Sequence, residues 1–336
     1  MRIPRIAFLL VLTAAAALTG QALAVELPQN RPTSDPAALE QKLQQQRDLP
    51  PGRIEGFVHI PDVKEGVLVQ PQGRMFRDVR TQYQPWIDAV LIVVAIAAMA
   101  GMYLFAGSMR VAKDREGRTI QRFTGFERFI HWLTAVSFIW LALTGLNLVF
   151  GRWLLLPVIG AGAFSGLAAF AKLSHNSVGF AFMAGLAAMT LQWLRHNIPS
   201  RLDVAWIKTA GGMFGGPHPP ARKFNAGQKM IYWIAVFGGG AISLTGVALL
   251  APFYGLDVNG MQVMQVLHSV IAALMIAVII GHVYLGTVGI RGSFDAMSTG
   301  RVDLNWAHEH HSLWLEEERA KGRVPPDEAL PMRPAE

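Results

Sequence analysis

The chain has 336 residues, of which 52% are hydrophobic and only 16% charged, and it contains no cysteine. This composition excludes an ordinary soluble domain and predicts several membrane-spanning helices. The lack of cysteine excludes disulfides, thiolate-bound iron–sulfur clusters and covalent haem attachment through a CxxCH motif. We attribute the formal charge of +7 to the basic cytoplasmic loops that membrane proteins carry, and we expect no nucleic-acid binding.

The N-terminus has the pattern of a secretory signal peptide. Two arginines precede a short apolar core that ends in the small residues ALA at 22–24. Residues 1–24 are therefore expected to be a signal peptide, and the mature chain to begin in the periplasm. Residues 25–85 are polar and are expected to form a periplasmic arm, in which residues 56–70 favour a hairpin. Docking of this arm to a partner is an alternative.

Five apolar segments follow, each near the ~20 residues that a spanning helix needs. They are residues 86–106, 129–150, 175–194, 230–251 and 267–289. The predicted fold class is an all-α integral membrane protein with a five-helix transmembrane assembly. The first helix is additional to a four-helix domain at 107–290, and residues 291–336 form a C-terminal tail.

The distribution of basic residues predicts the orientation. The loops at 107–128 and 195–229 each contain six Lys or Arg, whereas the loop at 151–172 has two and the loop at 252–266 has none. Cytoplasmic loops carry the excess of Lys and Arg, so the first two loops and the C-terminal tail are expected in the cytoplasm. This orientation agrees with the signal peptide and implies multi-pass insertion in the cell inner membrane.

Four histidines fall at two predicted depths in the membrane. His268 and His282 lie fourteen residues apart on the last segment, which corresponds to ~21 Å along a helix and places them within ~40° of one direction. His175 begins the third segment at the outer face, and His131 begins the second segment at the inner face. Depth therefore pairs His268 with His175 outside, and His282 with His131 inside.

Two facing pairs of imidazoles suit two haems, each held from both sides. An iron with both axial positions filled transfers electrons rather than activating oxygen. Single histidines also serve as interfacial hydrogen-bonding residues, and a proton pathway is a further alternative that would require more carboxylates at depth. Zinc is disfavoured because two histidines in a layer leave a tetrahedral set incomplete.

Two basic residues are candidate partners for haem propionates. Arg128 and Lys172 each precede a histidine of the pairs by three residues, close to one helical turn. Interfacial anchoring is the alternative for both. The histidines at 308, 310 and 311 are interpreted as part of a polar cytoplasmic helix, with metal binding as an alternative.

At this point the sequence resembles a known family. The segments GFERFIHWLTAVSFIWLALTG, AKLSHNSVGF, KFNAGQKMIYW and QVLHS followed by GHVYLG are similar to the gamma subunit of membrane-bound formate dehydrogenase, a dihaem cytochrome b. The similarity runs from about residue 120 to 310. The signal peptide, the arm and the first helix depart from the shorter, four-helix members.

The resemblance implies a four-helix dihaem cytochrome b bundle with a set of site residues. The implied ligands of two haem b groups are His131, His175, His268 and His282. It also implies a quinone site beside the inner haem, formed partly by the segment Asn225, Ala226, Gly227, Gln228 and Lys229, with His282 nearby. Gly227 is expected to leave room for the quinone ring, and a helix cap is the alternative role of Asn225.

The resemblance further implies the partners and the reaction. A separate alpha subunit containing molybdenum or tungsten would oxidise formate, and an iron–sulfur beta subunit would pass the electrons to the outer haem. This chain would anchor the complex and reduce quinone at the cytoplasmic side, with no catalytic residue for formate oxidation of its own. The alternatives are the cytochrome b subunit of a membrane-bound hydrogenase or a related oxidoreductase and, from another class, a transporter or a cofactor-free anchor.

Overall fold

A computed structural model describes residues 71–108, 117–212, 218–252 and 254–324. The chain divides into two compact units, Met1–Met75 and Phe76–Glu336, and the account below concerns the second. The predicted signal peptide and residues 25–70 of the predicted periplasmic arm lie outside the described residues, whereas the end of that arm, residues 71–85, is helical.

Five helices in the described residues are long and apolar enough to cross a membrane. The core helices of these spans are α4 (Gln84–Ala106), α5 (Gly125–Leu154), α6 (Leu156–Trp193), α8 (Ala226–Leu250) and α9 (Val258–Tyr284). Helix α3 (Pro71–Asp78) and a π-helical turn (Val79–Tyr83) lead into α4, and a second π-helical turn (Leu285–Gly289) follows α9. The predicted fold class, an all-α membrane protein with five spanning helices, is confirmed.

Polar caps decide where three of these helices begin. The side chains of Thr124, Asn225 and Asp257 accept hydrogen bonds from backbone N–H groups in the first turns of α5, α8 and α9. A capped turn satisfies donors that would otherwise lack partners, so each helix begins four to nine residues before its apolar segment. Hydropathy alone does not detect these polar first turns.

The sequence prediction of a loop at 151–172 is wrong. Helices α5 and α6 are separated by Leu155 alone, and α6 continues through this region with a kink at Gly160, where φ is +77°. The segment after the kink contains alanines and large apolar residues and no charge before Lys172, so it can continue as a helix. Only a glycine adopts such a backbone angle at little cost, which permits the sharp change of direction.

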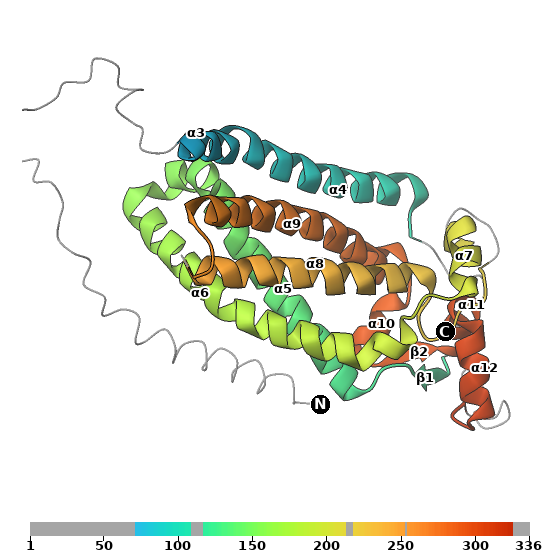
Figure 1. Ribbon diagram of the computed structural model, residues 1–336. Helices are drawn as coiled ribbons and strands as arrows, with labels where there is room; N and C mark the ends of the chain where they lie inside the picture. The colour runs from blue at the N-terminus through green and yellow to red at the C-terminus, as the bar shows by residue number, and fades with distance from the viewer. Residues whose placement is uncertain (1–70, 109–116, 213–217, 253, 325–336) are drawn as a thin grey trace, which may run out of the picture. The chain divides into compact units, whose positions relative to one another are not determined.

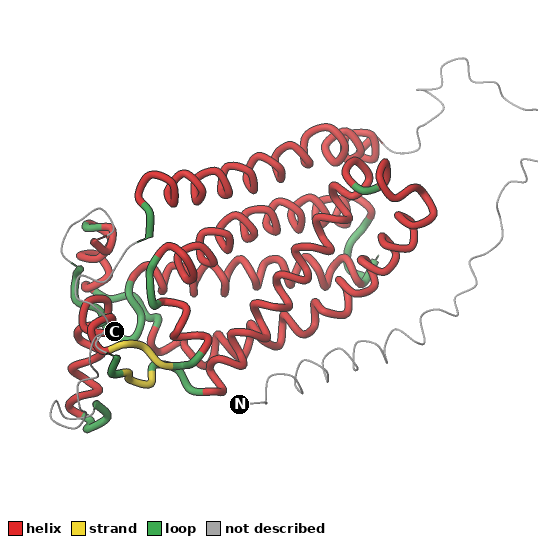
Figure 2. Tube along the Cα trace, turned by 180° about the vertical axis from the view of Figure 1, so that it is seen from behind, coloured by secondary structure: helices red, strands yellow, loops and turns green. Residues whose placement is uncertain are grey.

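Spanning helices that follow one another in the sequence pack against each other in pairs. Helix α5 packs along α6, α8 packs along α9, and α6 also contacts α8. Helix α4 packs along α9, and Figures 1 and 2 show these two helices side by side from opposite directions. The additional helix therefore contacts the bundle through the helix that carries His268 and His282.

The C-terminal residues fold into a compact structure at one end of the bundle (Figure 1). Strand β1 (Thr119–Gln121) pairs antiparallel with β2 (Arg301–Asp303), with Ile120 opposite Val302. Helices α10 (Ser293–Ser298), α11 (Leu304–His310) and α12 (Ser312–Ala320) complete it. We call β1, β2 and α10 to α12 the C-terminal cap. The prediction of a simple polar tail missed this structure.

The cap has an aromatic core that joins it to the bundle. Trp306 and Trp314 are 4% exposed, and Leu315 is 1% exposed. They belong to one cluster with Phe123 and Phe224, which precede α5 and α8. Burial of large apolar side chains contributes roughly 1.5–3 kcal/mol each, so the cap holds the first turns of these two helices together.

Candidate functional site

The structure brings the four predicted histidines together in two pairs. His131 near the start of α5 faces His282 near the end of α9, and His175 on α6 faces His268 on α9. We call the first the cap-side pair, because α5 begins and α9 ends at the C-terminal cap, and the second the cap-distal pair. These are the pairs that depth in the membrane predicted.

The separation of the rings fits a single metal ion between each pair. The ring centroids are 6.3 Å apart in the cap-side pair and 6.1 Å apart in the cap-distal pair. Imidazole nitrogen binds metals at about 2 Å and lies roughly 1.1 Å from its ring centre, so two rings on one ion stand about 6.2 Å apart. Both pairs can therefore supply two axial nitrogen ligands to one ion.

Two threonines orient the cap-distal pair. The Oγ1 atom of Thr144 lies 2.9 Å from Nδ1 of His175, and Oγ1 of Thr245 lies 2.9 Å from Nδ1 of His268. Each hydroxyl also donates its hydrogen to a carbonyl of its own helix, at 2.8 Å for Thr144 and 3.0 Å for Thr245. A hydroxyl has only one hydrogen, so it accepts from Nδ1–H of the histidine, which leaves the Nε2 lone pair free to bind a metal.

Sequence reasoning missed both threonines, although a signal was present. Of the three LTG tripeptides in the sequence, those at 143–145 and 244–246 lie within predicted membrane segments, and each of these two copies faces one histidine. The glycine of each copy lies against the ring, since a Cβ at Gly145 would be 3.6 Å from Cε1 of His175 and one at Gly246 would be 3.3 Å from Cε1 of His268. The repeat therefore provides both a hydrogen bond and room for the imidazole.

The cap-side pair lacks an equivalent support. Nδ1 of His131 is buried and has no hydrogen-bond partner among the described residues. The ring of His131 instead contacts Trp132 edge-on, at 5.4 Å between centroids. The two pairs thus differ in how firmly the protein fixes their rings.

The two candidate propionate partners lie in different surroundings. Arg128 donates hydrogen bonds to three backbone carbonyls around the end of α10, those of Met297, Ser298 and Thr299. In this structure its guanidinium therefore joins α5 to the cap. The side chain of Lys172 is exposed.

The NAGQK segment forms the first turn of α8. Asn225 and Gln228 make a reciprocal capping box, in which Asn225 Oδ1 accepts from the Gln228 N–H at 3.0 Å and Gln228 Oε1 accepts from the Asn225 N–H at 3.1 Å. Lys229 pairs with Asp203 of helix α7 (Arg201–Lys208) at 2.9 Å. Asn225 therefore caps helix α8, which was the alternative role predicted for it from the sequence.

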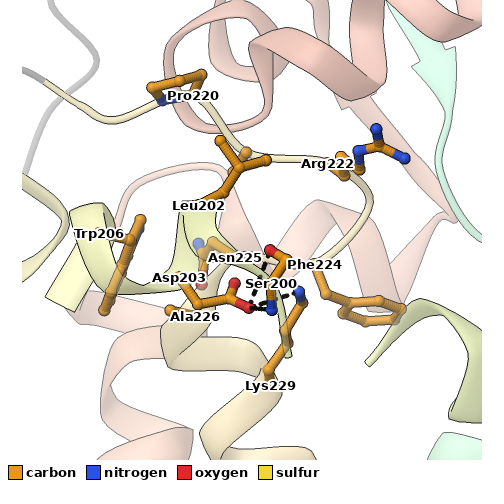
Figure 3. Close-up of a pocket in the computed structure, with 11 residues that line it drawn as sticks. Ser200, Leu202, Asp203, Trp206, Pro220, Arg222, Phe224, Asn225, Ala226 and Lys229 are labelled. Atoms are coloured by element: carbon orange, nitrogen blue, oxygen red, sulfur yellow. Dashed lines mark hydrogen bonds and ion pairs between the residues drawn. The ribbon is translucent and has the colours of Figure 1, made fainter. Parts of the chain in front are cut away.

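The space beside Gly227 is filled by an indole. A Cβ at Gly227 would lie 2.7 Å from Cη2 of Trp206 on α7. Figure 3 shows the pocket between α7 and the start of α8, with Trp206, Asn225 and Lys229 among its lining residues. This pocket has room for about one water molecule, so the room expected for a quinone ring at Gly227 is occupied by Trp206.

A buried arginine connects this segment to the cap. Nη2 of Arg122 donates to the Lys223 carbonyl at 2.6 Å and to Nε2 of His311 at 3.0 Å, and it lies 3.5 Å from Gln228 Oε1. Its guanidinium also lies 5.1 Å from the ring centre of Trp314. Burial lowers the pKa of Arg122 to about 9, which leaves it charged at neutral pH.

His311 is a structural residue of the cap rather than part of a solvated helix. It is fully buried, and complete burial together with the charge of Arg122 lowers the pKa of His311 well below its usual range. The neutral ring donates from Nδ1 to the Arg222 carbonyl at 2.7 Å and accepts from Arg122. The interpretation of residues 308–311 as a polar helix is therefore wrong for His311, although His308 is exposed.

Comparison with known proteins identifies the family. A sequence model of the family described as prokaryotic cytochrome b561 matches residues 122–300. The cytochrome b556(fdo) subunit of formate dehydrogenase from Escherichia coli (strain K12) is 30% identical over 206 residues, which cover 60% of this chain and 94% of that protein. The chain belongs to the formate dehydrogenase cytochrome b subunits of the prokaryotic cytochrome b561 family.

Two further relatives are also cytochrome b556 subunits of formate dehydrogenase. The nitrate-inducible cytochrome b556(Fdn) subunit of formate dehydrogenase from Escherichia coli (strain K12) is 27% identical over 224 residues, covering 64% of this chain and 99% of that protein. The cytochrome b556 subunit of formate dehydrogenase from Haemophilus influenzae is 26% identical over 196 residues, covering 57% and 80%. Helix α4 of this cytochrome b lies outside the residues that the family model matches.

The family implies haem b, and the histidine pairs fit it. Each pair provides two neutral imidazole donors at the separation that one iron requires. Open space lies beside Gly179 and Gly286, which follow His175 and His282 by one helical turn. A flat macrocycle can approach the helix backbone there.

Proposed function

We propose that this cytochrome b subunit holds two haem b groups and carries electrons through the inner membrane from an outer iron–sulfur partner to quinone at the cytoplasmic side. The single observation that supports it most is the presence of two facing histidine pairs, at 6.3 and 6.1 Å, at two levels of one helix. The ligands would be His131 and His282 for the inner haem and His175 and His268 for the outer haem. Each haem, when bound, would accept and release one electron.

The absorption spectrum of the purified chain tests this proposal. We expect b-type bands on reduction and two haems per chain, because the two pairs provide four axial ligands. A chain that bears no haem would instead be a cofactor-free anchor or a transporter. One haem per chain would contradict the use of both pairs.

The proposed orientation has the C-terminal cap in the cytoplasm. It is supported by the surplus of Lys and Arg in the loops on the cap side of the bundle. In this arrangement the signal peptide (1–24) and arm (25–85) precede the additional helix, and the cytochrome b domain (107–290) precedes the C-terminal tail (291–336). Electrons that cross from the outer to the inner level move charge against the membrane potential, at ~2.3 kcal/mol per elementary charge per 100 mV.

Reporter fusions give the first prediction. A reporter at residue 60 or 260 is expected to be periplasmic, and one at 118 or 210 cytoplasmic, because the basic loops remain inside. Measurements of a periplasm-specific and a cytoplasm-specific reporter at each site provide matched controls. A periplasmic reporter at 118 would reverse the order of the two haems and contradict the proposal.

The partners follow from the electron path. Because this chain has no cysteine, it cannot hold an iron–sulfur cluster through thiolates. We therefore propose that an iron–sulfur beta subunit delivers the electrons and that a molybdenum or tungsten alpha subunit oxidises formate. The names of the relatives support assembly with the other formate dehydrogenase subunits. Lys172 would pair with a propionate of the outer haem. Arg128 would pair with a propionate of the inner haem if that carboxylate replaced one of the three backbone carbonyls that Arg128 bonds in the structure.

The first turn of α8 is the proposed quinone site. Asn225, Ala226, Gly227 and Gln228 lie at the cap end of α8, and His282 lies at the cap end of α9, so both border the inner level. Amides can hydrogen-bond a quinone carbonyl. A ring that binds against Gly227 must displace the Trp206 indole, so we propose that Trp206 covers the site when quinone is absent.

Haem reoxidation gives the second prediction. Asn225→Ala and Gln228→Ala are expected to keep both haems and their reduction by formate, yet to slow reoxidation by quinone. Each also removes half of the capping box, at a cost of ~1 kcal/mol. Asn225→Ser separates the two roles, because serine caps a helix but has no amide. Normal haem reoxidation in Asn225→Ser would show that the amide of Asn225 does not contact quinone.

A further inference from the structure

Helix α4 carries a buried carboxylate within its membrane-length sequence. Asp88 is 3% exposed, and Gln84, one helical turn earlier, is 5% exposed. Ser269 of α9 donates a hydrogen bond from Oγ to Oδ2 of Asp88 at 2.7 Å. Ser269 directly follows His268, so Asp88 is fixed to the turn of α9 that carries one ligand of the cap-distal pair.

The carboxylate has little compensation within the protein. Among the residues that the structure describes, no Lys, Arg or His forms an ion pair with Asp88, and its Oδ1 atom has no hydrogen-bond partner. A carboxylate at such a position is costly and usually marks a functional site. The Ser269 hydroxyl and the side chain of Gln84 are neutral donors to this carboxylate. They do not offset the burial of a full charge, so an ionised Asp88 requires a positive charge nearby.

The oxidised haem can supply that positive charge. A ferric iron in a porphyrin, held by two neutral imidazoles, has one net positive charge at its centre, and this charge disappears when the iron accepts one electron. A fixed negative charge in a medium of low dielectric stabilises the ferric form more than the ferrous form. It therefore lowers the reduction potential of the iron, as other protein charges do at haem centres.

We propose that Asp88 lowers the reduction potential of the haem at the cap-distal pair. The inference rests on the proposed function, because it requires a haem held by His175 and His268. It concerns α4, which lies outside residues 122–300 matched by the family model. A lower potential at the cap-distal haem favours the transfer of each electron to the cap-side haem, so the additional helix assists the inward electron path.

A redox titration of the purified full-length chain, followed by absorption, tests the inference. The wild type is expected to show two one-electron transitions, with the cap-distal haem at the lower potential. The single-histidine variants His175→Ala and His131→Ala assign each transition to its pair. Asparagine has nearly the same shape as aspartate but no charge, so Asp88→Asn is expected to shift the potential of the cap-distal transition upward. The potential of the cap-side transition is expected to stay unchanged.

Asp257 provides the matched control. It is an exposed carboxylate at the cap-distal end of α9, and it caps the helix by accepting from the Gly260 N–H at 2.7 Å. Asp257→Asn removes one negative charge from the same helix end and keeps a capping side chain. Because solvent screens that charge, both potentials are expected to remain at their wild-type values.

The outcomes are distinct. An Asp88→Asn protein with two haems and unchanged potentials overturns the inference. So does loss of the cap-distal haem from both Asp88→Asn and Asp88→Ser, since the carboxylate would then be required for binding. If neither variant accumulates, the reduction potentials of the two haems in the wild-type protein test the inference. A cap-distal haem with the higher of the two potentials overturns it. A wild type without two haems would instead refute the proposed function itself.

Discussion

Replacement of His175 with alanine is expected to halve the haem content, from two haems per chain to one. The variant removes one axial ligand from the cap-distal pair and leaves the cap-side pair intact. Because the pairs lie at different levels of α9, the remaining haem should keep its reduced absorption bands. His131→Ala is expected to have the reverse effect, with loss of the cap-side haem alone.

The measurement is a haem assay with reduced spectra of each purified variant. His196→Ala is a suitable control, because His196 lies beyond the end of α6 and outside both pairs, so both haems should remain. Added imidazole is expected to restore the missing haem by occupying the space that the alanine leaves. If each single-histidine variant still held two haems, the assignment of ligands would be wrong.

Arg122→Met is expected to destabilise the junction between the C-terminal cap and the bundle. The substitution leaves the Lys223 carbonyl and Nε2 of His311 without their donor, and each buried unpaired acceptor costs about 1–3 kcal/mol. The contact of the guanidinium with the Trp314 ring is lost as well. Removal of the cost of burying the charge offsets part of this loss, so we expect a net destabilisation of about 2–4 kcal/mol.

Thermal unfolding in detergent and limited proteolysis of the C-terminal residues measure this effect. Arg301→Met is the control, because Arg301 is exposed and bonds Thr119 at the surface, so its loss should change stability by less than about 0.5 kcal/mol. Arg122→Lys should be intermediate, since one ammonium cannot reproduce the geometry of the guanidinium. Equal stability of Arg122→Met and the wild type would contradict the role of Arg122.

The sequence predicts the membrane helices and the histidine pairs for the same physical reason. A helix rises by a constant distance per residue, so the apolar length fixes where a span lies and a residue number fixes a depth. His131 and His282 could therefore be matched without knowledge of any contact. The helix starts were less accurate, because caps such as Thr124 lie in polar turns that hydropathy does not register.

The C-terminal cap could not be predicted by the same means. Its helices have six to nine residues and its strands have three. Such elements are too short for a hydrophobic periodicity to be distinctive. Its centre joins Arg122, Lys223 and His311, which are distant in sequence and are brought together only by the folded bundle. The packing of Trp206 against Gly227 was missed for the same reason, since a glycine in a sequence does not reveal which side chain covers it.

The threonine bonds of the cap-distal pair have a consequence for the maturation of the protein. A histidine that is already hydrogen-bonded through Nδ1 has lost most of its rotational freedom before a cofactor arrives, so the proposed binding of haem at His175 and His268 would carry a smaller loss of side-chain entropy. Nδ1 of His131 has no such partner among the residues that the structure describes, so a haem bound there would have to order this ring itself. Under the proposed function, the two levels of the bundle would be unequal during assembly, and the cap-distal level would be the one prepared to receive its haem first.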